Sequence, residues 1–229
     1  MRTDYLLHDG AYQRRRNDSE YAGWSKHEEV AETWRLIWQP LMAKRVFPNQ
    51  GKLLELGCGA GNVSIGFAQV GYEVTGVDIA PTAISWAIEN AAEANVSINF
   101  LQGDVLELTG IADDSFDVVL DGHCFHCIIG EDRARFLQSA RHVLRVGGIL
   151  AISTMCNQVP DTKFFRENFD PQSRCMMRGD VATRYIGDSN DILAEIMSAG
   201  FRLLDVDIMT PQHQEDLADL RLLAALGES

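Results

Sequence analysis

KLLELGCGAG, residues 52–61, decides the fold of this chain. Its first five residues form a short apolar run that predicts a buried strand, and three glycines follow at alternate positions. Such a turn needs backbone angles that other residues rarely adopt, and it leaves the main chain bare where a ligand approaches. A helical pattern over residues 61–70 follows at once. The stretch therefore predicts a strand, a tight turn and a helix.

Short apolar runs alternate with helical patterns beyond this stretch. This regular alternation is typical of right-handed crossovers, which place parallel strands in one sheet with helices on both faces. We therefore predict an α/β fold with a doubly wound, mostly parallel sheet. The predicted strands are 73–77, 98–102, 116–120, 149–154 and 201–208, the predicted helices are 81–94, 133–144 and 190–199, and a final apolar run covers 220–226.

Two segments interrupt this rhythm. Residues 1–23 are polar and predict an irregular leader, which precedes a helical pattern from Ser25 that Pro40 should end or kink. Residues 156–188 predict an irregular insertion after the fifth strand, over the strand ends. With no linker in the sequence, we predict a single domain, 1–229, made of an N-terminal lid and helix (1–48), a cofactor-binding core (50–155), a substrate-covering insertion (156–188) and a C-terminal helix with strands (189–229).

The composition argues against several functions. The chain has 229 residues, 46% hydrophobic and 23% charged, which suits one globular domain with an ordinary core. A formal net charge of −13 predicts neither nucleic-acid nor membrane binding, because phosphates are neutralised by Lys and Arg. The five cysteines form no regular disulfide set, and we see no signal peptide and no apolar run of about 18 residues. We therefore predict a cytoplasmic protein, a monomer or a homodimer.

Acidic residues end the predicted strands where open α/β sheets bind ligands. Asp78 ends the second strand, about 20 residues after the glycines, where a carboxylate accepts hydrogen bonds from ribose hydroxyls. Gly103-Asp104 ends the third strand and Asp121 the fourth. With Glu55-Leu56-Gly57-Cys58-Gly59-Ala60-Gly61, Phe116-Asp117-Val118-Val119 and Leu144-Arg145-Val146-Gly147-Gly148, the series resembles the class I S-adenosylmethionine-dependent methyltransferases over residues 50–155.

The resemblance implies a Rossmann-like methyltransferase fold, S-adenosyl-L-methionine as cofactor, and a small-molecule acceptor methylated at an O, N, S or C centre. It implies that Gly57, Gly59 and Gly61 approach the methionine part of the cofactor. Asp121, or its carbonyl, is expected near the methionine amine and the sulfonium. Glu55 is expected to organise the glycine turn.

The same resemblance places the nucleoside part of the cofactor. Asp78 is expected to hold the ribose, and Ile79 to pack on the adenine. Asp104 is expected to hydrogen-bond the adenine amino group, with the backbone of Val105 at the ring edge.

Two alternatives accompany this interpretation. A nicotinamide dehydrogenase also needs glycines and a ribose-binding acid, but its Gly-x-Gly-x-x-Gly register would put Asn62 at the third glycine position. A protein that binds S-adenosylmethionine without methylating, as a sensor, partner subunit or catalyst of other sulfonium chemistry, would carry the same glycines and acids. That second alternative stays open.

Residues 121–127, Asp-Gly-His-Cys-Phe-His-Cys, follow the fourth strand and allow three interpretations. Histidine and cysteine are common zinc ligands, but the four of them here lie within five consecutive residues and cannot all surround one tetrahedral ion. We therefore predict no metal. His123, nearest the strand end, is the candidate general base for an acceptor that must lose a proton. The remaining four side chains are expected to pack locally.

Aromatic residues in the N-terminal segment are candidates for a lid over the acceptor. Tyr21 and Trp24 lie in irregular sequence, and such rings exclude water and can face a cationic sulfonium. Trp34 and Trp38, at helical spacing, are expected in the core.

Overall fold

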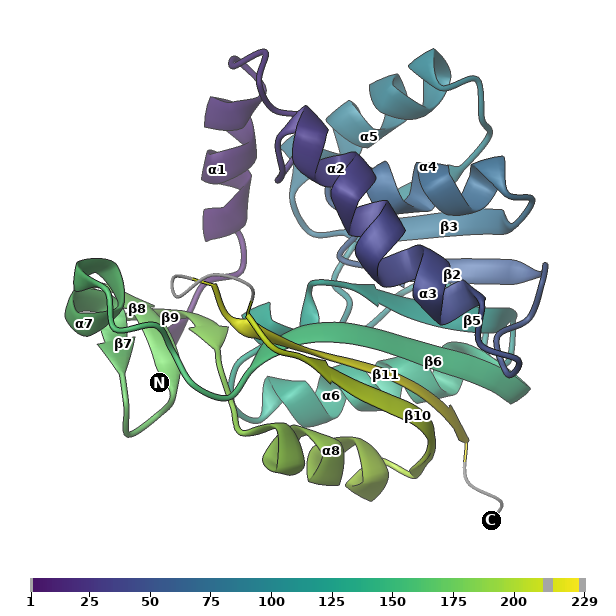
Figure 1. Cartoon of the computed structure of the whole chain (residues 1–229). Helices are drawn as coiled ribbons and strands as arrows, with labels where there is room; N and C mark the ends of the chain where they lie inside the picture. The colour runs from purple at the N-terminus through teal and green to yellow at the C-terminus, as the bar shows by residue number, and fades with distance from the viewer. Residues whose placement is uncertain (1, 212–215, 227–229) are drawn as a thin grey trace.

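The computed structural model of the chain describes residues 2–211 and 216–226, and it is organised around a seven-stranded sheet (Figure 1). The strand order is β10-β11-β6-β5-β2-β3-β4, and β11 runs antiparallel to both of its neighbours while the pairs from β6 to β4 are parallel. This confirms the predicted doubly wound, mostly parallel sheet. The strands are β2 (Lys52–Leu56), β3 (Glu73–Asp78), β4 (Asn99–Gln102), β5 (Phe116–Gly122), β6 (Leu144–Cys156), β10 (Phe201–Met209) and β11 (Ala218–Leu226).

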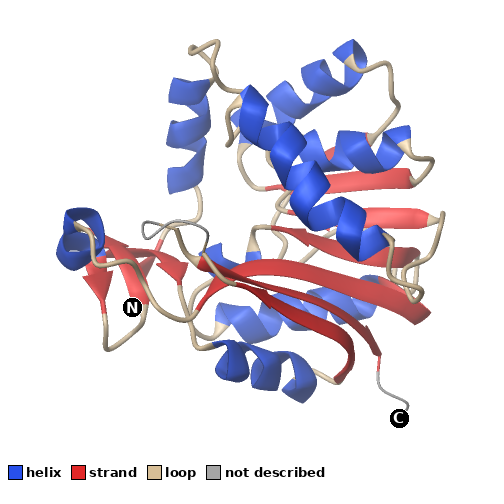
Figure 2. Cartoon of the chain, viewed as in Figure 1, coloured by secondary structure: helices blue, strands red, loops and turns tan. Residues whose placement is uncertain are grey.

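Helices cover both faces of this sheet, as Figure 2 shows. Consecutive strand residues therefore belong to opposite cores: Leu53 and Val118 pack in one cluster, Leu54 and Val119 in the other. This double burial explains why the central strands read as continuous apolar runs. One face carries α4 (Asn62–Gln69), α5 (Pro81–Glu93), α2 (His27–Thr33) and α3 (Gln39–Met42), and the other carries α6 (Asp132–Val143) and α8 (Ser189–Ser198).

The prediction of an irregular leader is wrong, because α1 (Leu7–Arg15) forms there. Tyr12 is its one buried residue, so the apolar periodicity that reveals a helix in a sequence is missing. Distant contacts hold the helix instead. The Arg16 guanidinium, directly after it, pairs with Glu89 of α5, and the Asp9 carboxylate accepts a hydrogen bond from the first turn of α5.

The prediction of an irregular insertion over residues 156–188 is also wrong. The segment forms α7 (Lys163–Asn168), β7 (Phe169–Asp170), β8 (Cys175–Arg178) and β9 (Val181–Tyr185). These strands join β1 (Arg2–Thr3) in a small sheet of order β1-β9-β8-β7, visible beside the main sheet in Figure 1. Strands of two to five residues show no usable alternation, and the β1–β9 pairing joins opposite ends of the chain.

The helix before β2 does not end at Pro40 but changes its hydrogen bonding there. A π-helical turn, η1 (Trp34–Trp38), separates α2 from α3, which continues to Met42. Proline has no N–H to donate to the carbonyl four residues earlier, which belongs to Leu36. That carbonyl accepts a hydrogen bond from the guanidinium of Arg221 on β11.

Candidate functional site

A cavity of about 410 Å³ lies at the carboxyl ends of the central strands. This volume is within the range usual for small-molecule sites. Most residues predicted to bind the cofactor line it, namely Glu55, Gly57, Gly59, Asp78, Ile79, Asp104 and Val105. The candidate base His123 and the candidate lid residue Trp24 line it as well, whereas Gly61, Asp121 and Tyr21 do not.

The glycine turn between β2 and α4 has the geometry that its sequence predicts. Gly57 and Gly59 have φ angles of +69° and +53°, in the left-handed region that favours glycine. A β-carbon on Gly57 would collide with Cys124, and one on Gly59 would collide with the hydroxyl of Tyr12. The turn therefore presents bare backbone to the cavity while the two neighbouring segments pack directly against it.

Asp78, the last residue of β3, supports the turn from below. Its Oδ2 accepts a hydrogen bond from the Gly59 N–H at 2.9 Å, and its Oδ1 accepts one from the Ala80 N–H at 2.8 Å. Burial raises the pKa of this carboxyl group. Each carboxylate oxygen can accept a further hydrogen bond, so a diol in the cavity can still be held. The neighbouring Asp104 likewise accepts from the Leu106 N–H, at 2.8 Å, and faces the cavity.

Glu55 brings a buried carboxyl group to the cavity floor. Its side chain is 1% exposed, and its Oε2 accepts a hydrogen bond from the Ser64 hydroxyl on α4. The pKa of Glu55 is raised to about 8, chiefly by burial and in smaller part by the nearby carboxylates of Asp78 and Asp121. A cation bound above this group would favour its ionised form.

Two residues that were predicted to bind the cofactor contact other protein groups around the site in this structure. Gly61 precedes α4, and a β-carbon there would come within 2.7 Å of the Phe100 ring. Asp121 is buried, and its Oδ1 accepts hydrogen bonds from the N–H groups of Cys124 at 2.7 Å and Phe125 at 2.8 Å. It thereby fixes the turn after β5. Contact of either residue with the cofactor stays a prediction.

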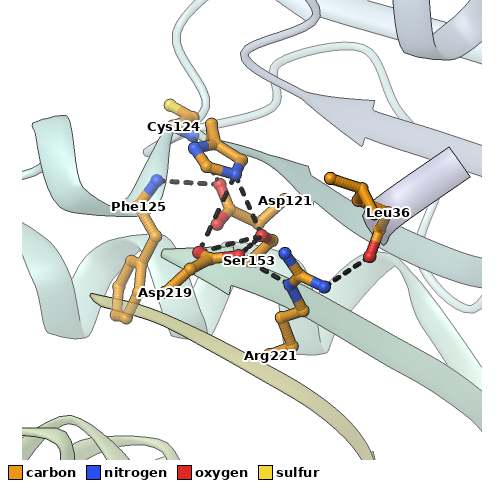
Figure 3. A network of polar contacts seen from close by, with 8 residues as sticks. Leu36, Asp121, Cys124, Phe125, Ser153, Asp219 and Arg221 are labelled. Carbon is orange, nitrogen blue, oxygen red and sulfur yellow. Dashed lines mark hydrogen bonds and ion pairs between the residues drawn. The ribbon is translucent and has the colours of Figure 1, made fainter. Parts of the chain in front are cut away.

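His123 stands on that turn with a φ of +69° and a side chain that is 35% exposed. Its Nε2 lies 2.9 Å from the hydroxyl of Ser153, which donates to the carboxylate of Asp219 at 2.9 Å. The Nε–H of Arg221 donates to the same carboxylate at 2.7 Å. Figure 3 shows this network from Ser153 through Asp219 and Arg221 to the Leu36 carbonyl.

Our sequence analysis missed Ser153, Asp219 and Arg221. They lie on β6 and β11, which read as apolar strands, and their partner His123 is far away in the sequence. A signal was present in β11: two opposite charges stand at alternate positions of an otherwise apolar run. Such positions share one face of a strand.

Burial favours the neutral forms of Cys124, His126 and Cys127 in the 121–127 cluster. Burial lowers the pKa of His126 well below its usual value, and burial raises the pKa of the Cys127 thiol to about 12. Burial also raises the pKa of the Cys124 thiol. Within residues 2–211 and 216–226, no group of three or more His, Cys, Asp or Glu side chains is placed to hold a metal ion.

Segments before β2 line the cavity with aromatic rings, from the helices and from the bend at Trp24. Trp24 packs edge-on against Tyr12 with ring centroids 5.6 Å apart, and the guanidinium of Arg15 lies 4.0 Å from a Trp24 ring centroid. Trp34 and Trp38 pack against Phe67, as expected for core residues, and both also line the cavity.

Comparison with known proteins gives a consistent result. Residues 54–152 match the model of a methyltransferase domain family. The chain is 30% identical to the ubiquinone biosynthesis O-methyltransferase of Azorhizobium caulinodans over 165 residues. This match covers 72% of this chain and 64% of that protein. The first three curated relatives are matched over 29%, 64% and 40% of their own lengths.

Two solved structures show the same fold. A protein from Pyrococcus horikoshii OT3 superposes with a TM-score of 0.73 at 19% identity, covering 94% of this chain and 98% of that one. The 1,6-didemethyltoxoflavin-N1-methyltransferase of Burkholderia thailandensis, solved with bound 1,6-didemethyltoxoflavin and S-adenosylhomocysteine, superposes with a TM-score of 0.65 at 21% identity, covering 96% of this chain and 85% of that one.

Proposed function

Because the chain belongs to the class I S-adenosylmethionine-dependent methyltransferases, we propose that it transfers a methyl group from S-adenosyl-L-methionine to a small molecule and releases S-adenosylhomocysteine. One observation carries this proposal: a single cavity joins the bare turn at Gly57 and Gly59, the acid Asp78 and the imidazole of His123. The named proteins support a small-molecule acceptor, because one is an O-methyltransferase of ubiquinone biosynthesis and the other is a 1,6-didemethyltoxoflavin-N1-methyltransferase.

The residues at the strand ends fit the cofactor. When bound, the cofactor supplies a methyl group on a positively charged sulfur. The glycine turn presents the main chain of Gly57 and Gly59 to the cavity, where we expect the methionine part of the cofactor, and the buried Glu55 carboxylate offers a counter-charge. Asp78 is positioned for the ribose hydroxyls, and Asp104 and Ile79 for the adenine. Val105 lines the same wall.

The part of the cavity that is lined by tryptophan rings suits an acceptor. Trp24, Trp34 and Trp38 exclude water from it, which helps alignment for an in-line displacement. The indole N–H of Trp38 is buried and has no hydrogen-bond partner among the described residues. His123 is placed to take the proton from an acceptor O–H, N–H or S–H group.

A transfer assay tests the proposal. We expect labelled methyl from S-adenosylmethionine to appear in at least one member of a panel of phenols, amines, thiols and carbon acids. His123→Ala should slow transfer by about 10²-fold or more while calorimetry finds unchanged affinity for S-adenosylhomocysteine. His142→Ala, at an exposed position on α6, is the matched control and should change neither quantity.

Two results would contradict the proposal. Tight binding of the cofactor with no transfer to any acceptor would favour a protein that binds S-adenosylmethionine without methylating. If calorimetry finds no association with the cofactor or with S-adenosylhomocysteine, the assignment of the cavity fails.

We also propose a cytoplasmic location, a monomer or a homodimer, and no nucleic-acid partner. The proposal rests on the free thiols of all five cysteines and on the net charge of −13. In the described part of the chain, the helices are too short or too polar to cross a membrane.

A further inference from the structure

We propose that Ser153 and Asp219 are positioning residues that hold the neutral His123 ring with its proton on Nε2, so that Nδ1 is the atom that removes the acceptor's proton. The inference rests on the proposed function for its chemical consequence, but the tautomer itself is a property of the protein alone. None of the motifs in the sequence places these two residues at the site.

The tautomer follows from counting protons along the network. The Ser153 hydroxyl has one proton, and both carboxylate oxygens of Asp219 lie within reach of its Oγ, at 2.9 and 3.1 Å. An ionised carboxylate can only accept, so the serine proton points to Asp219. The Ser153 oxygen then has only lone pairs to offer His123, 2.9 Å away, and Nε2 must be the donor. The lone pair of the neutral ring is therefore on Nδ1.

Arg221 keeps this arrangement in place from the other side. Its Nε–H donates to Asp219 Oδ2 at 2.7 Å, so the guanidinium and the carboxylate form a charge-assisted hydrogen bond. Its terminal nitrogen donates to the Leu36 carbonyl, the group for which Pro40 provides no N–H. The helical segment that covers the cavity is thus connected to the residue that orients Asp219.

Burial makes this orientation persistent. Ser153 is 0% exposed, and Asp219 and Arg221 have side chains largely shielded from solvent. Hydrogen bonds to an ionised group in such surroundings are stronger and less screened than those at an exposed surface. The imidazole itself lines the cavity, and none of the described residues hydrogen-bonds to its Nδ1.

The grouping of serine, histidine and aspartate does not make Ser153 a nucleophile. Its hydroxyl is fully buried within β6, whereas a nucleophile has to reach the substrate. In a hydrolytic triad the carboxylate contacts Nδ1 of the histidine, and the histidine contacts the serine. Here the carboxylate contacts the serine instead, so the order of the three residues differs from that of a triad. The role of the serine is to relay the charge of Asp219, whose Oδ1 lies 3.8 Å from His123 Nε2.

The proton transfer balances with the methyl transfer. The X–H bond of the acceptor breaks and its proton goes to Nδ1, while the acceptor's electron pair forms the new bond to the methyl carbon. The pair of the broken carbon–sulfur bond stays on sulfur. The positive charge that leaves sulfur thus reappears on the imidazolium, where Asp219 stabilises it through Ser153, and the proton is later released to solvent.

Nitrogen-15 NMR of the histidine-labelled, ligand-free protein at alkaline pH tests the tautomer directly, with His123→Gln to assign the signals. We expect the Nε2–H form in the wild type. Ser153→Ala and Asp219→Asn should shift His123 toward a mixture of the two tautomers. Asp207→Asn, at an exposed position on β10, is the matched control and should leave the spectrum unchanged.

Kinetics then tests the consequence. Ser153→Ala and Asp219→Asn should each lower kcat for an acceptor found in the panel at least about tenfold, with little change in KM or in affinity for S-adenosylhomocysteine. An Nδ1–H tautomer in the wild type would overturn the inference, even if methyl transfer is found. So would a tautomer of His123 that is unchanged in both Ser153→Ala and Asp219→Asn. The NMR experiment gives its answer even if no acceptor is found. Failure of the proposed function is therefore distinguishable from failure of the inference about the tautomer.

Discussion

Glu55→Gln should make the protein more stable in alkaline solution. Burial raises the pKa of Glu55 from 4.5 to about 8, so between these pH values the folded state holds a proton that the unfolded chain has lost. Stability then falls as pH rises, by about 1.36 kcal/mol per pH unit for one group. Glutamine keeps an acceptor for the Ser64 hydroxyl but does not ionise. Between pH 5 and pH 8 the variant should therefore gain about 4 kcal/mol relative to the wild type.

Urea unfolding of the ligand-free protein at several pH values measures this gain. The comparison is the difference between variant and wild type, because other groups, such as Asp121 with its pKa of about 7, titrate in both proteins. Glu93→Gln, at an exposed position on α5, provides the matched control and should give a difference independent of pH. A pH-independent difference for Glu55→Gln as well would refute the argument, and it would mean that Glu55 is ionised at little cost in the empty site.

Two further substitutions test the cofactor wall and the core. Asp78→Asn should weaken binding of S-adenosylhomocysteine about 10- to 100-fold, the scale of about 1.5–3 kcal/mol for hydrogen bonds to a charged group; calorimetry that finds equal affinity would remove Asp78 from the ribose. Phe67→Ala should lower the free energy of unfolding by about 3–5 kcal/mol, because this ring is 1% exposed and packs among Trp34, Trp38 and other aromatic rings. Phe164→Ala, at a ring that is 58% exposed, is its control in urea unfolding and should have little effect.

The core of the fold could be predicted because its signals are local. β2 matches its predicted bounds at both ends, and β3 differs only by the addition of Asp78. Each of these strands is buried on both faces and is followed by a turn and a helix, so a window of a dozen residues contains the whole pattern. The glycine turn was predictable for the same reason, since the angles of Gly57 and Gly59 are needed within one short segment.

The rest depends on contacts between distant segments. The helix α1 is held by α5 and by the glycine turn, and its own sequence contributes one buried ring, Tyr12. The small sheet pairs Arg2 with Val181, a contact that no local window contains. The network behind His123 is of this kind too, because register between β6 and β11 sets Arg221 opposite Ser153. Pairing register is determined by the folded sheet as a whole and not by either strand alone.

The charges around the cavity explain how one site can hold a cationic cofactor and release its product. Burial raises the pKa of Glu55, Asp78 and Asp121, so ionising these groups in the empty site is unfavourable. In the proposed complex a sulfonium lies near Glu55 and stabilises its ionised form, and this stabilisation contributes to affinity. S-adenosylhomocysteine lacks that positive charge, because its sulfur is a neutral thioether. The carboxyl groups that destabilise the empty protein therefore favour binding of the substrate over its product, and this preference should increase as pH rises toward 8, where Glu55 ionises.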